Sequence, residues 1–474
     1  MSISSILTLS LSLLAGGEAP QWGGFRGNNG AGTDSATRLP ATLDPEGNLM
    51  WRVDVPSGYS SPTIAGKDLY LTGTDDKAKL FTLCLDAYSG EERWRKELAY
   101  DGKRPGQNSP AAPSPATDGE RVYALFHHVG LVAYDKTGKE LWKKPLGPFN
   151  IPHGLSTSPV LHGDLVILQV DQDDGAYLVA YDKLTGAERW KIDRPGVAHG
   201  YATPAVFEPA GRAPELVVSS SFQIAGYSLD KGEKLWWVDG SGWQSKAVPV
   251  FAGGQCFVNA YVPTIGEMQY GSLTGTFEEA LAAHDADKDG KLADSEWPDE
   301  KLRQLWFLFD KDGDRLVDAD DYEFGLKCNR ERGALFAIQP EGKGDLTQKG
   351  VRWKLDDRRV LSDSTSPVIL DGFLYIVTDG GILTAVDLAS GKAGKQERVG
   401  DSDSYYASPV AGDGKLYLCG LQDQLAVVKA GAAWEVLSVT HLEEGTELWA
   451  TPALAGHAVY VRAKNALYCF EDPD

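Results

Sequence analysis

Short alternations of apolar and polar residues follow one another along the chain and repeat about every 45 residues. The stretch from Ser158 to Asp193 shows one such unit, with the segments SPVLHG, DLVILQVD, YLVAYDKLTG and ERWKID. Alternation with a period of two, bounded by Gly and Asp, predicts β-strands, and no helical period runs through the unit. Each unit is therefore expected to form a sheet of four short strands.

A corner motif marks five places in this repeat. A glycine stands four residues before a tryptophan in the pairs Gly47 and Trp51, Gly90 and Trp94, Gly138 and Trp142, Gly186 and Trp190, and Gly232 and Trp236. Asp-like residues before the glycine favour a turn, and the glycine supplies the positive φ that closes it. The next strand then carries a large aromatic side chain to one face.

A second signature is a small residue before a proline at the start of an alternating strand. It occurs at Ser61-Pro62, Ala112-Pro113, Ser158-Pro159, Thr203-Pro204, Val248-Pro249, Ser366-Pro367, Ser408-Pro409 and Thr451-Pro452. Proline at the first position of a strand removes no ladder hydrogen bond. Eight four-stranded units of this length predict an all-β fold, an eight-bladed β-propeller.

The two ends of the chain are expected to complete one blade together. The last unit, from Ala450 to Phe470, holds only three strands, whereas the strand LMWRVDV from Leu49 to Val55 has no unit of its own. Pairing these segments would supply the fourth strand and hide both open sheet edges.

The repeat AYDKLTGAERW, from Ala180 to Trp190, resembles the repeats of the PQQ-like (quinoprotein/BamB-type) β-propeller family. The resemblance covers most of the chain and implies the propeller fold. It does not imply the cofactor, because many members of the family keep the repeats without binding PQQ. In the quinoprotein enzymes the resemblance also leads us to look for adjacent cysteines against the cofactor ring, and this sequence has none.

The net charge and the N-terminal sequence limit the partners and the cellular location that are expected. The net charge of −21 argues against nucleic acid as a partner and favours cations. The apolar run from Ile6 to Leu14, followed by small residues, predicts a signal peptide over residues 1–19, a secreted or periplasmic location, and no membrane-spanning segment. Five scattered cysteines show no disulfide or metal spacing and are expected to be buried apolar residues.

Residues 264–332 interrupt the repeat and differ from it in character. They separate residues 20–263 from residues 333–474, the two parts of the propeller, and lie between the second and third strands of the fifth unit. Two acidic loops each follow an expected amphipathic helix, with Phe277, Leu281 and His284 on one face of the first and Leu302, Leu305, Trp306 and Phe309 on one face of the second. We expect a small α-helical insertion in blade five.

The first loop, from Asp285 to Glu296, resembles an EF-hand. Its expected calcium ligands are Asp285, Asp287, Asp289, the backbone carbonyl of Lys291, and Glu296. Gly290 supplies the sharp turn between the carboxylates and the carbonyl, and Glu296 can bind with both oxygens.

The second loop has the same spacing with two departures. Its expected ligands are Asp310, Asp312, Asp314, the carbonyl of Leu316, Asp318 and Asp321. Arg315 replaces the loop glycine, and a left-handed residue other than glycine costs about 1–2 kcal/mol. Asp321 replaces glutamate and is one methylene shorter. We therefore expect two sites, the second weaker.

A further candidate site is the mouth of the central channel. Residues just before each small-residue–proline pair are expected to surround it, namely Tyr59, Asn108, His153, His199, Gln244, Asp363 and Tyr405. A ring of this polarity suits a small polar ligand or a metal.

No Ser/His/Asp or Cys/His spacing points to catalysis. The sequence favours a secreted or periplasmic calcium-binding propeller that serves as a binding or interaction scaffold for a protein or a small polar ligand. Two alternatives stay open: a quinoprotein oxidoreductase that uses PQQ on an alcohol or sugar, and a calcium-tuned envelope-assembly or adhesion module.

Overall fold

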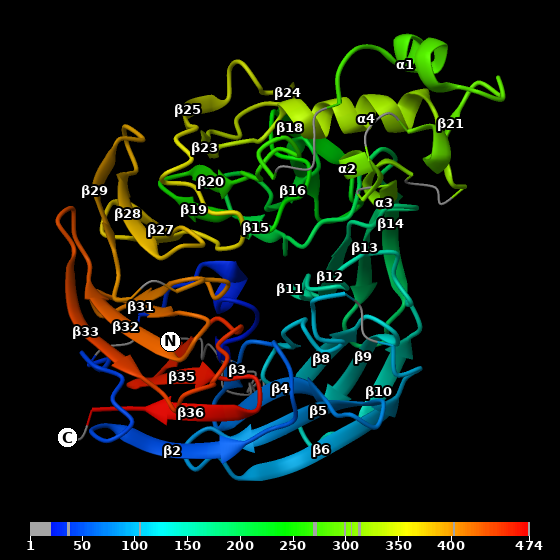
Figure 1. The fold of residues 1–474 in the computed structure, drawn as a ribbon. Coiled ribbons are helices and arrows are strands. Elements are labelled where there is room, and N and C mark those ends of the chain that lie inside the picture. Colours follow the sequence, from blue (N-terminus) through cyan, green and yellow to red (C-terminus); the bar gives the residue numbers. More distant parts are fainter. Residues whose placement is uncertain are drawn as a thin grey trace, which may run out of the picture.

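A computed structural model of the chain describes residues 20–35, 38–103, 106–268, 273–297, 300–304, 306–310, 314–401 and 403–472. Eight sheets, each built on four antiparallel strands, stand in a ring around a central axis (Figure 1). The predicted eight-bladed, all-β propeller with four-stranded blades is confirmed. The predicted signal peptide, residues 1–19, lies outside the described residues. Within the described ranges, no helix is long and apolar enough to cross a lipid bilayer.

The strands occupy equivalent positions in every blade, counted from the axis outward. The innermost strands are β3 (Thr63–Ala65), β7 (Ala116–Thr117), β11 (Val160–His162), β15 (Ala205–Phe207), β19 (Val250–Ala252), β26 (Val368–Leu370), β30 (Val410–Gly412) and β34 (Ala453–Ala455). The second strands are β4 (Asp68–Thr74), β8 (Arg121–Phe126), β12 (Leu165–Val170), β16 (Glu215–Ser220), β20 (Gln255–Asn259), β27 (Phe373–Val377), β31 (Lys415–Cys419) and β35 (Ala458–Arg462).

The outer half of each blade follows the same order. The third strands are β5 (Lys79–Asp86), β9 (Gly130–Asp135), β13 (Tyr177–Asp182), β17 (Gln223–Ser228), β23 (Leu335–Ile338), β28 (Ile382–Asp387), β32 (Gln424–Lys429) and β36 (Ala466–Phe470). The outermost strands are β6 (Glu92–Ala99), β10 (Glu140–Lys144), β14 (Glu188–Asp193), β18 (Lys234–Asp239), β25 (Val351–Leu355), β29 (Ala393–Arg398), β33 (Glu435–His441) and β2 (Leu49–Asp54). Two blades gain a fifth strand, because β1 (Pro20–Trp22) pairs with β3 and β24 (Gly344–Asp345) pairs with β18.

Burial within a blade depends on the distance from the axis. The second and third strands, such as β12 and β13, are buried along almost their whole length, because neighbouring blades cover both of their faces. The outermost strands β2 and β6 alternate between half-buried and exposed positions. The alternation expected along the whole unit is therefore present only in its outermost strand, whereas the middle strands are apolar on both faces.

Tryptophans of the corner type join five of the eight blades to the next one. A Cβ atom added at Gly186 would lie 2.7 Å from the ring of Trp142 in the preceding blade. The indole N–H of Trp142 donates to the carbonyl of Lys183 in the same corner, at 3.1 Å. The same packing joins Trp51 to Gly90, Trp94 to Gly138, Trp190 to Gly232, and Trp353 to Gly391.

Two members of the motif depart from the prediction. Gly47 does not have the positive φ found at the other four glycines, because its turn closes through the amides of Gly47 and Asn48, which both donate to the carbonyl of Asp44. Trp236 packs against Gly226 of its own blade, and its indole N–H donates to Glu215 at 2.6 Å.

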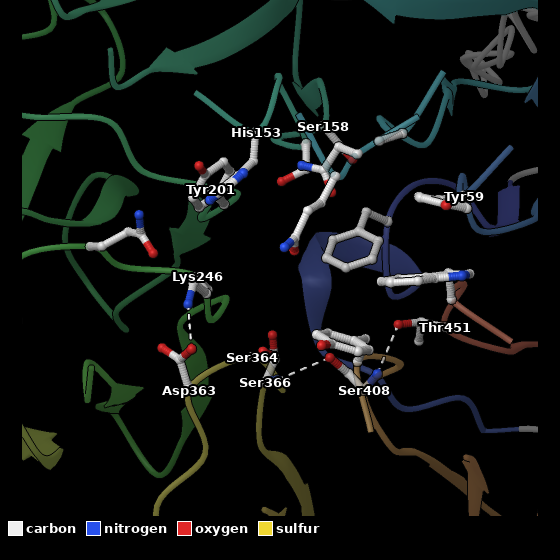
Figure 2. A pocket seen from close by; sticks show the side chains of 18 of the residues that line it. Tyr59, His153, Ser158, Tyr201, Lys246, Asp363, Ser364, Ser366, Ser408 and Thr451 are labelled. Carbon is white, nitrogen blue, oxygen red and sulfur yellow. Dashed lines mark hydrogen bonds and ion pairs between the residues drawn. The ribbon is translucent and has the colours of Figure 1, made fainter. Parts of the chain in front are cut away.

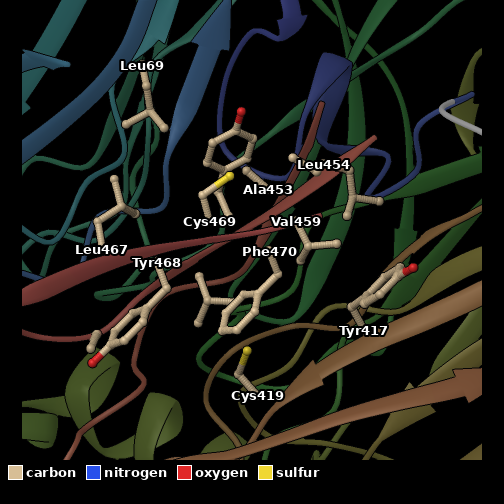
Figure 3. Packing of buried hydrophobic residues seen from close by; sticks show 14 of the residues in the cluster. Leu69, Tyr417, Cys419, Ala453, Leu454, Val459, Leu467, Tyr468, Cys469 and Phe470 are labelled. Atoms are coloured by element: carbon tan, nitrogen blue, oxygen red, sulfur yellow. The ribbon is translucent and has the colours of Figure 1, made fainter. Parts of the chain in front are cut away.

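The N-terminal strand closes the ring, as predicted. Strand β2 pairs antiparallel with β36, with Leu49 opposite Phe470 and Asp54 opposite Ala466. Figure 3 shows the core at this closure, where Leu69 of blade one and Tyr417 of blade seven belong to the same cluster as Phe470. All five cysteines are free and buried, as expected from their apolar surroundings.

Residues 20–35 join the innermost strands of blades on opposite sides of the ring, so this arm crosses the central channel. Beside the 3-10 helix η1 (Asn28–Gly30), the side-chain amide of Asn29 exchanges two hydrogen bonds with the backbone of Val206 in blade four, at 2.5 and 2.6 Å. The guanidinium of Arg26 is fully buried and donates to the carbonyls of Ser366, Pro367 and Pro409 in blades six and seven.

The chain leaves blade five after β20 and returns at β23. The described elements between them are α1 (Phe277–His284), β21 (Leu292–Ala293), η2 (Asp294–Glu296), α2 (Glu300–Arg303), α3 (Trp306–Phe309), β22 (Leu316–Val317) and α4 (Ala319–Arg330), at the periphery of the ring in Figure 1. Of the residues expected on the helix faces, Leu305 lies outside the described residues. Trp297, Phe309 and Tyr322 form a buried core, which Phe324 extends to Phe222 of blade four, at a ring distance of 5.4 Å.

Candidate functional site

The loop that follows α1 gathers three carboxylates. Oxygen atoms of Asp285, Asp287 and Asp289 all lie within 4.8 Å of one another. Gly290 has a φ of +85°, and its amide donates to the carboxylate of Asp285 at 3.1 Å. The turn at the glycine thus brings the carboxylates to one side of the loop.

Glu296 closes this loop from its far end. Its carboxylate accepts hydrogen bonds from the amides of Ala293 at 2.9 Å and Ala286 at 2.8 Å. These bonds, first the one from Ala293, lower the pKa of Glu296 and favour its charged form. Of the predicted positions, Asp285, Asp287 and Asp289 are brought together, whereas Glu296 is joined to the loop through its bonds to the amides of Ala286 and Ala293.

The second loop repeats part of this geometry. The described positions of its predicted set are Asp310, Asp314, Leu316, Asp318 and Asp321, whereas Asp312 lies outside the described residues. The amide of Arg315 donates to Asp310 at 3.1 Å, as the amide of Gly290 does to Asp285. Arg315 has a φ of +66°, the left-handed conformation expected at this position.

The two loops are paired side by side. Leu292 of β21 lies opposite Val317 of β22, and both side chains are fully buried. The ammonium of Lys291 also reaches across to the carboxylate of Asp314, at 2.7 Å. Because the pairing fixes the eighth residue of one loop against the eighth of the other, the loops form one unit.

A cavity of about 430 Å³ opens at the mouth of the central channel. Six of the seven residues predicted for the mouth line it, and they come from different blades: Tyr59, Asn108, His153, His199, Gln244 and Asp363 (Figure 2). Phe25 of the channel-crossing arm lines it as well.

Tyr405 corrects the prediction at the seventh position. Its side chain is fully buried and its hydroxyl donates to the carbonyl of Val399 at 3.3 Å, in the core between blades six and seven. The adjacent residue Tyr406 lines the cavity instead. The side chains of consecutive residues in an extended segment point to opposite sides. A prediction that is wrong by one position therefore selects a core residue in place of a cavity residue.

The residues that line the cavity lie at a constant number of positions before the innermost strands. The residues predicted above lie at varying distances before the small-residue–proline pairs, so that prediction is less complete. In every blade, the residue four positions before the innermost strand lines the cavity: Tyr59, Ala112, Ser156, Tyr201, Lys246, Ser364, Tyr406 and Trp449. In blade two the strand begins after Ser114-Pro115, rather than after the predicted Ala112-Pro113. Counting back from each strand start would have found Lys246 and Trp449 from the sequence.

A ring of hydroxyl groups surrounds the base of the cavity. In six of the eight blades, the residue two positions before the innermost strand donates its backbone N–H to a hydroxyl at the same position of the next blade. These bonds run from Ser61 to Ser114 (2.8 Å), Ser114 to Ser158 (3.0 Å), Ser158 to Thr203 (3.0 Å), Val248 to Ser366 (3.0 Å), Ser366 to Ser408 (2.9 Å) and Ser408 to Thr451 (3.1 Å). The last two bonds are drawn in Figure 2.

Charged groups in the cavity wall are paired. Lys246 donates to Asp363 at 2.5 Å, and Nδ1 of His199 lies 2.6 Å from the carboxylate of Asp173. Burial, and then the neighbouring His199 and Lys246, lower the pKa of His153 and favour its neutral form. Behind Asp363, burial and the charge of Asp363 raise the pKa of Asp379.

An aromatic stack forms another part of the wall. The ring of Trp449 lies between those of Tyr59 and Tyr406, with centroid distances of 4.7 Å on each side. Trp243 and Met268 also line the cavity, and both pack against the core of the insertion. The cavity and the insertion therefore share part of their walls.

Comparison with known families agrees with this architecture. The profile of a PQQ-like family described as outer membrane protein assembly factor BamB matches residues 36–198 and 174–473. The chain belongs to this family. No curated protein matched the chain.

Several solved structures share the fold of this chain at low sequence identity. BamB from Moraxella catarrhalis is 10% identical, with a TM-score of 0.54, over 89% of this chain and 99% of that one. A europium-containing methanol dehydrogenase is 10% identical, with a TM-score of 0.61, over 96% and 98%. The quinohemoprotein alcohol dehydrogenase ADHIIG from Pseudomonas putida HK5 is 12% identical, with a TM-score of 0.55, over 92% and 78%. At these identities the likeness shows the fold alone.

Proposed function

We propose that this PQQ-like propeller binds calcium through an EF-hand pair in blade five and serves as a secreted or periplasmic binding scaffold. The observation that carries the calcium proposal is the pairing of two acidic loops through Leu292 and Val317, with three carboxylates converging in the first loop. Oxygen ligands from closely spaced carboxylates and one backbone carbonyl are what Ca²⁺ prefers. The first loop would bind calcium through Asp285, Asp287, Asp289, the carbonyl of Lys291, and Glu296.

The second loop is proposed to bind calcium more weakly. Arg315 holds a strained left-handed conformation, and Asp314, an expected ligand, is already paired with the ammonium of Lys291. Asp321 is too short to reach as a bidentate glutamate does. Together these features favour at least a tenfold weaker second site, since about 1.4 kcal/mol changes an affinity tenfold.

Calorimetry with calcium tests this order of affinities. The wild-type chain is expected to show a tight and a weak site, and Asp289→Ala should remove the tight one. Asp314→Ala should affect only the weak site, and it serves as the matched control because it shortens the same loop position. An Asp289→Ala variant that keeps full tight-site affinity would contradict the proposal.

The scaffold role is supported by the family description and by the cavity. A protein or small polar ligand is the proposed partner, and nucleic acid is disfavoured by the net charge of −21. A calcium-tuned role in envelope assembly or adhesion is a variant of this proposal, because the family is described by an assembly factor. Co-purification from envelope extracts with and without EDTA separates the variant from a calcium-independent scaffold.

A quinoprotein oxidoreductase is the second candidate, since two similar structures are alcohol dehydrogenases. PQQ carries three carboxylates, so its site needs several cationic partners that are not already neutralised by other groups. Among the described residues lining the cavity, Lys246 is the only lysine or arginine, and it is paired with Asp363. The lining therefore does not fit PQQ, and we derive no step through it.

A further inference from the structure

We propose that the cavity at the channel mouth binds a neutral saccharide, through one or two of its sugar rings. The inference rests on the proposed binding role of the propeller and names the chemical class of its ligand. Four properties of the cavity carry it: its size, its paired charges, its ring of hydroxyl groups and its aromatic stack.

The cavity has the size and depth of a small-molecule site. Its volume of about 430 Å³ falls within the range of about 300–1,000 Å³ typical of such sites. Phe25 lines it from the arm that crosses the channel, and Arg26 anchors that arm to blades six and seven. The channel is therefore not an open pore at this level, and a ligand would enter and leave by the mouth.

The paired charges favour a ligand without net charge. Lys246 and Asp363 neutralise each other while staying about one fifth exposed, and His199 faces Asp173. An anion or an amino-acid zwitterion would gain most by replacing one member of such a pair, at the cost of leaving the other without its partner. A hydroxyl group can instead accept from a second N–H of Lys246 while the ion pair stays intact.

The hydroxyl ring adds donors that are left available for a ligand. Ser114, Ser158, Ser366, Ser408 and Thr451 each accept a backbone N–H, and none of the hydrogen bonds found among the described residues uses their O–H groups as donors. These residues are only 1–3% exposed, so each hydroxyl can donate at most one bond to a ligand, and only toward the cavity that it lines. A polyol, whose oxygens both donate and accept, matches such a ring better than an apolar ligand.

The aromatic stack supplies a surface for the apolar faces of a sugar ring. Tyr59, Trp449 and Tyr406 form a continuous stack at the rim, and Tyr406 is 42% exposed. Aromatic rings with a polar edge are suited to ligands that combine C–H faces with hydroxyl groups. The cavity thus pairs aromatic surface with neutral hydrogen-bonding groups, as saccharide recognition requires.

Saturation-transfer NMR on the full chain tests the inference. The probes are glucose, galactose, mannose, N-acetylglucosamine, maltose and cellobiose, with glucuronate, galacturonate, glycine, glutamate and PQQ as the charged set. At least one neutral sugar is expected to bind, with the charged set silent. Tyr406→Ala should weaken that binding at least tenfold, and Tyr88→Ala, which removes another exposed tyrosine (69% exposed) outside the cavity lining, should leave it unchanged.

Three results would overturn the inference. They are the absence of a signal from every neutral sugar, binding of only the charged probes, and equal affinities of the wild type and the Tyr406→Ala variant. Each measurement is made once with calcium and once with EDTA, so that a sugar signal is sought in both states of the insertion. Failure of the calcium proposal appears in calorimetry alone, whereas failure of the saccharide inference appears in the NMR spectra under both conditions.

Discussion

His127 is held neutral by its surroundings in blade two. Its side chain is 5% exposed, and Nδ1 accepts the backbone amide of Leu155 at 3.1 Å, which only an unprotonated nitrogen can do. Burial, with a smaller effect from the charge of His128, lowers the pKa of His127 to about 4. Folding therefore excludes a proton that the unfolded chain would take up.

This residue predicts a loss of stability in mild acid. The unfolded histidine titrates near a pKa of about 6.5, so between about pH 6.5 and 4 the unfolded state binds more protons. The contribution is complete above that window and is lost as the pH falls through it, up to about 3 kcal/mol. Urea unfolding of the wild type and His127→Asn should show a smaller pH dependence in the variant, whose amide oxygen can still accept from Leu155. Identical pH profiles would contradict this account.

The residues at the channel mouth show how much of this site could be predicted from the sequence. Six of the seven predicted mouth residues line the cavity, because a strand start places the preceding segment at the rim. The prediction was wrong at Tyr405, because a shift of one residue in an extended segment turns the side chain from the cavity to the core. Tyr406 lines the cavity instead. The pairing of Lys246 with Asp363 joins residues 117 positions apart, which no local pattern reveals.

At the scale of the element, a joint formed by a tryptophan needs a glycine in the facing corner, because a Cβ atom there would collide with the indole ring. Gly186 and Gly163 both have positive φ, +69° and +54°, yet only Gly186 faces the ring of Trp142. The spacing of glycine and tryptophan in the sequence marks the motif, but the tryptophans other than Trp236 pack on the glycine of the following unit. The pair of Trp353 and Gly391 was not found from the sequence, because these two residues belong to successive units.

The two glycines make a matched pair of substitutions. Gly163→Ala should cost about 1 kcal/mol, because it adds only left-handed strain. Gly186→Ala should cost about 1–3 kcal/mol more, because its Cβ would lie 2.7 Å from the indole of Trp142. Denaturant unfolding measures both, and equal losses would show that the tryptophan does not restrict the corner.

At the scale of the whole molecule, counting repeats was enough to predict the closed ring. A three-stranded last unit and an unassigned first strand gave the pairing of β2 with β36. The course of residues 20–35 through the channel was not predictable, because a Gly- and Asn-rich segment has no period of its own. Its position depends on contacts such as that of Arg26 with Ser366, 340 residues away.

The central proposal is that calcium occupies the acidic loops of the insertion. Terbium luminescence tests it most directly, because Tb³⁺ takes calcium's place in oxygen-ligand sites and Trp297 directly follows the loop residue Glu296. Excitation of tryptophan should give terbium emission that calcium displaces. Asp289→Ala should remove the tight-binding part of that emission and leave only the part from the weaker second loop, where Trp306 lies 3.2 Å from the carboxylate of Asp310. An absence of emission from the wild type, or emission unchanged by Asp289→Ala, would contradict the account.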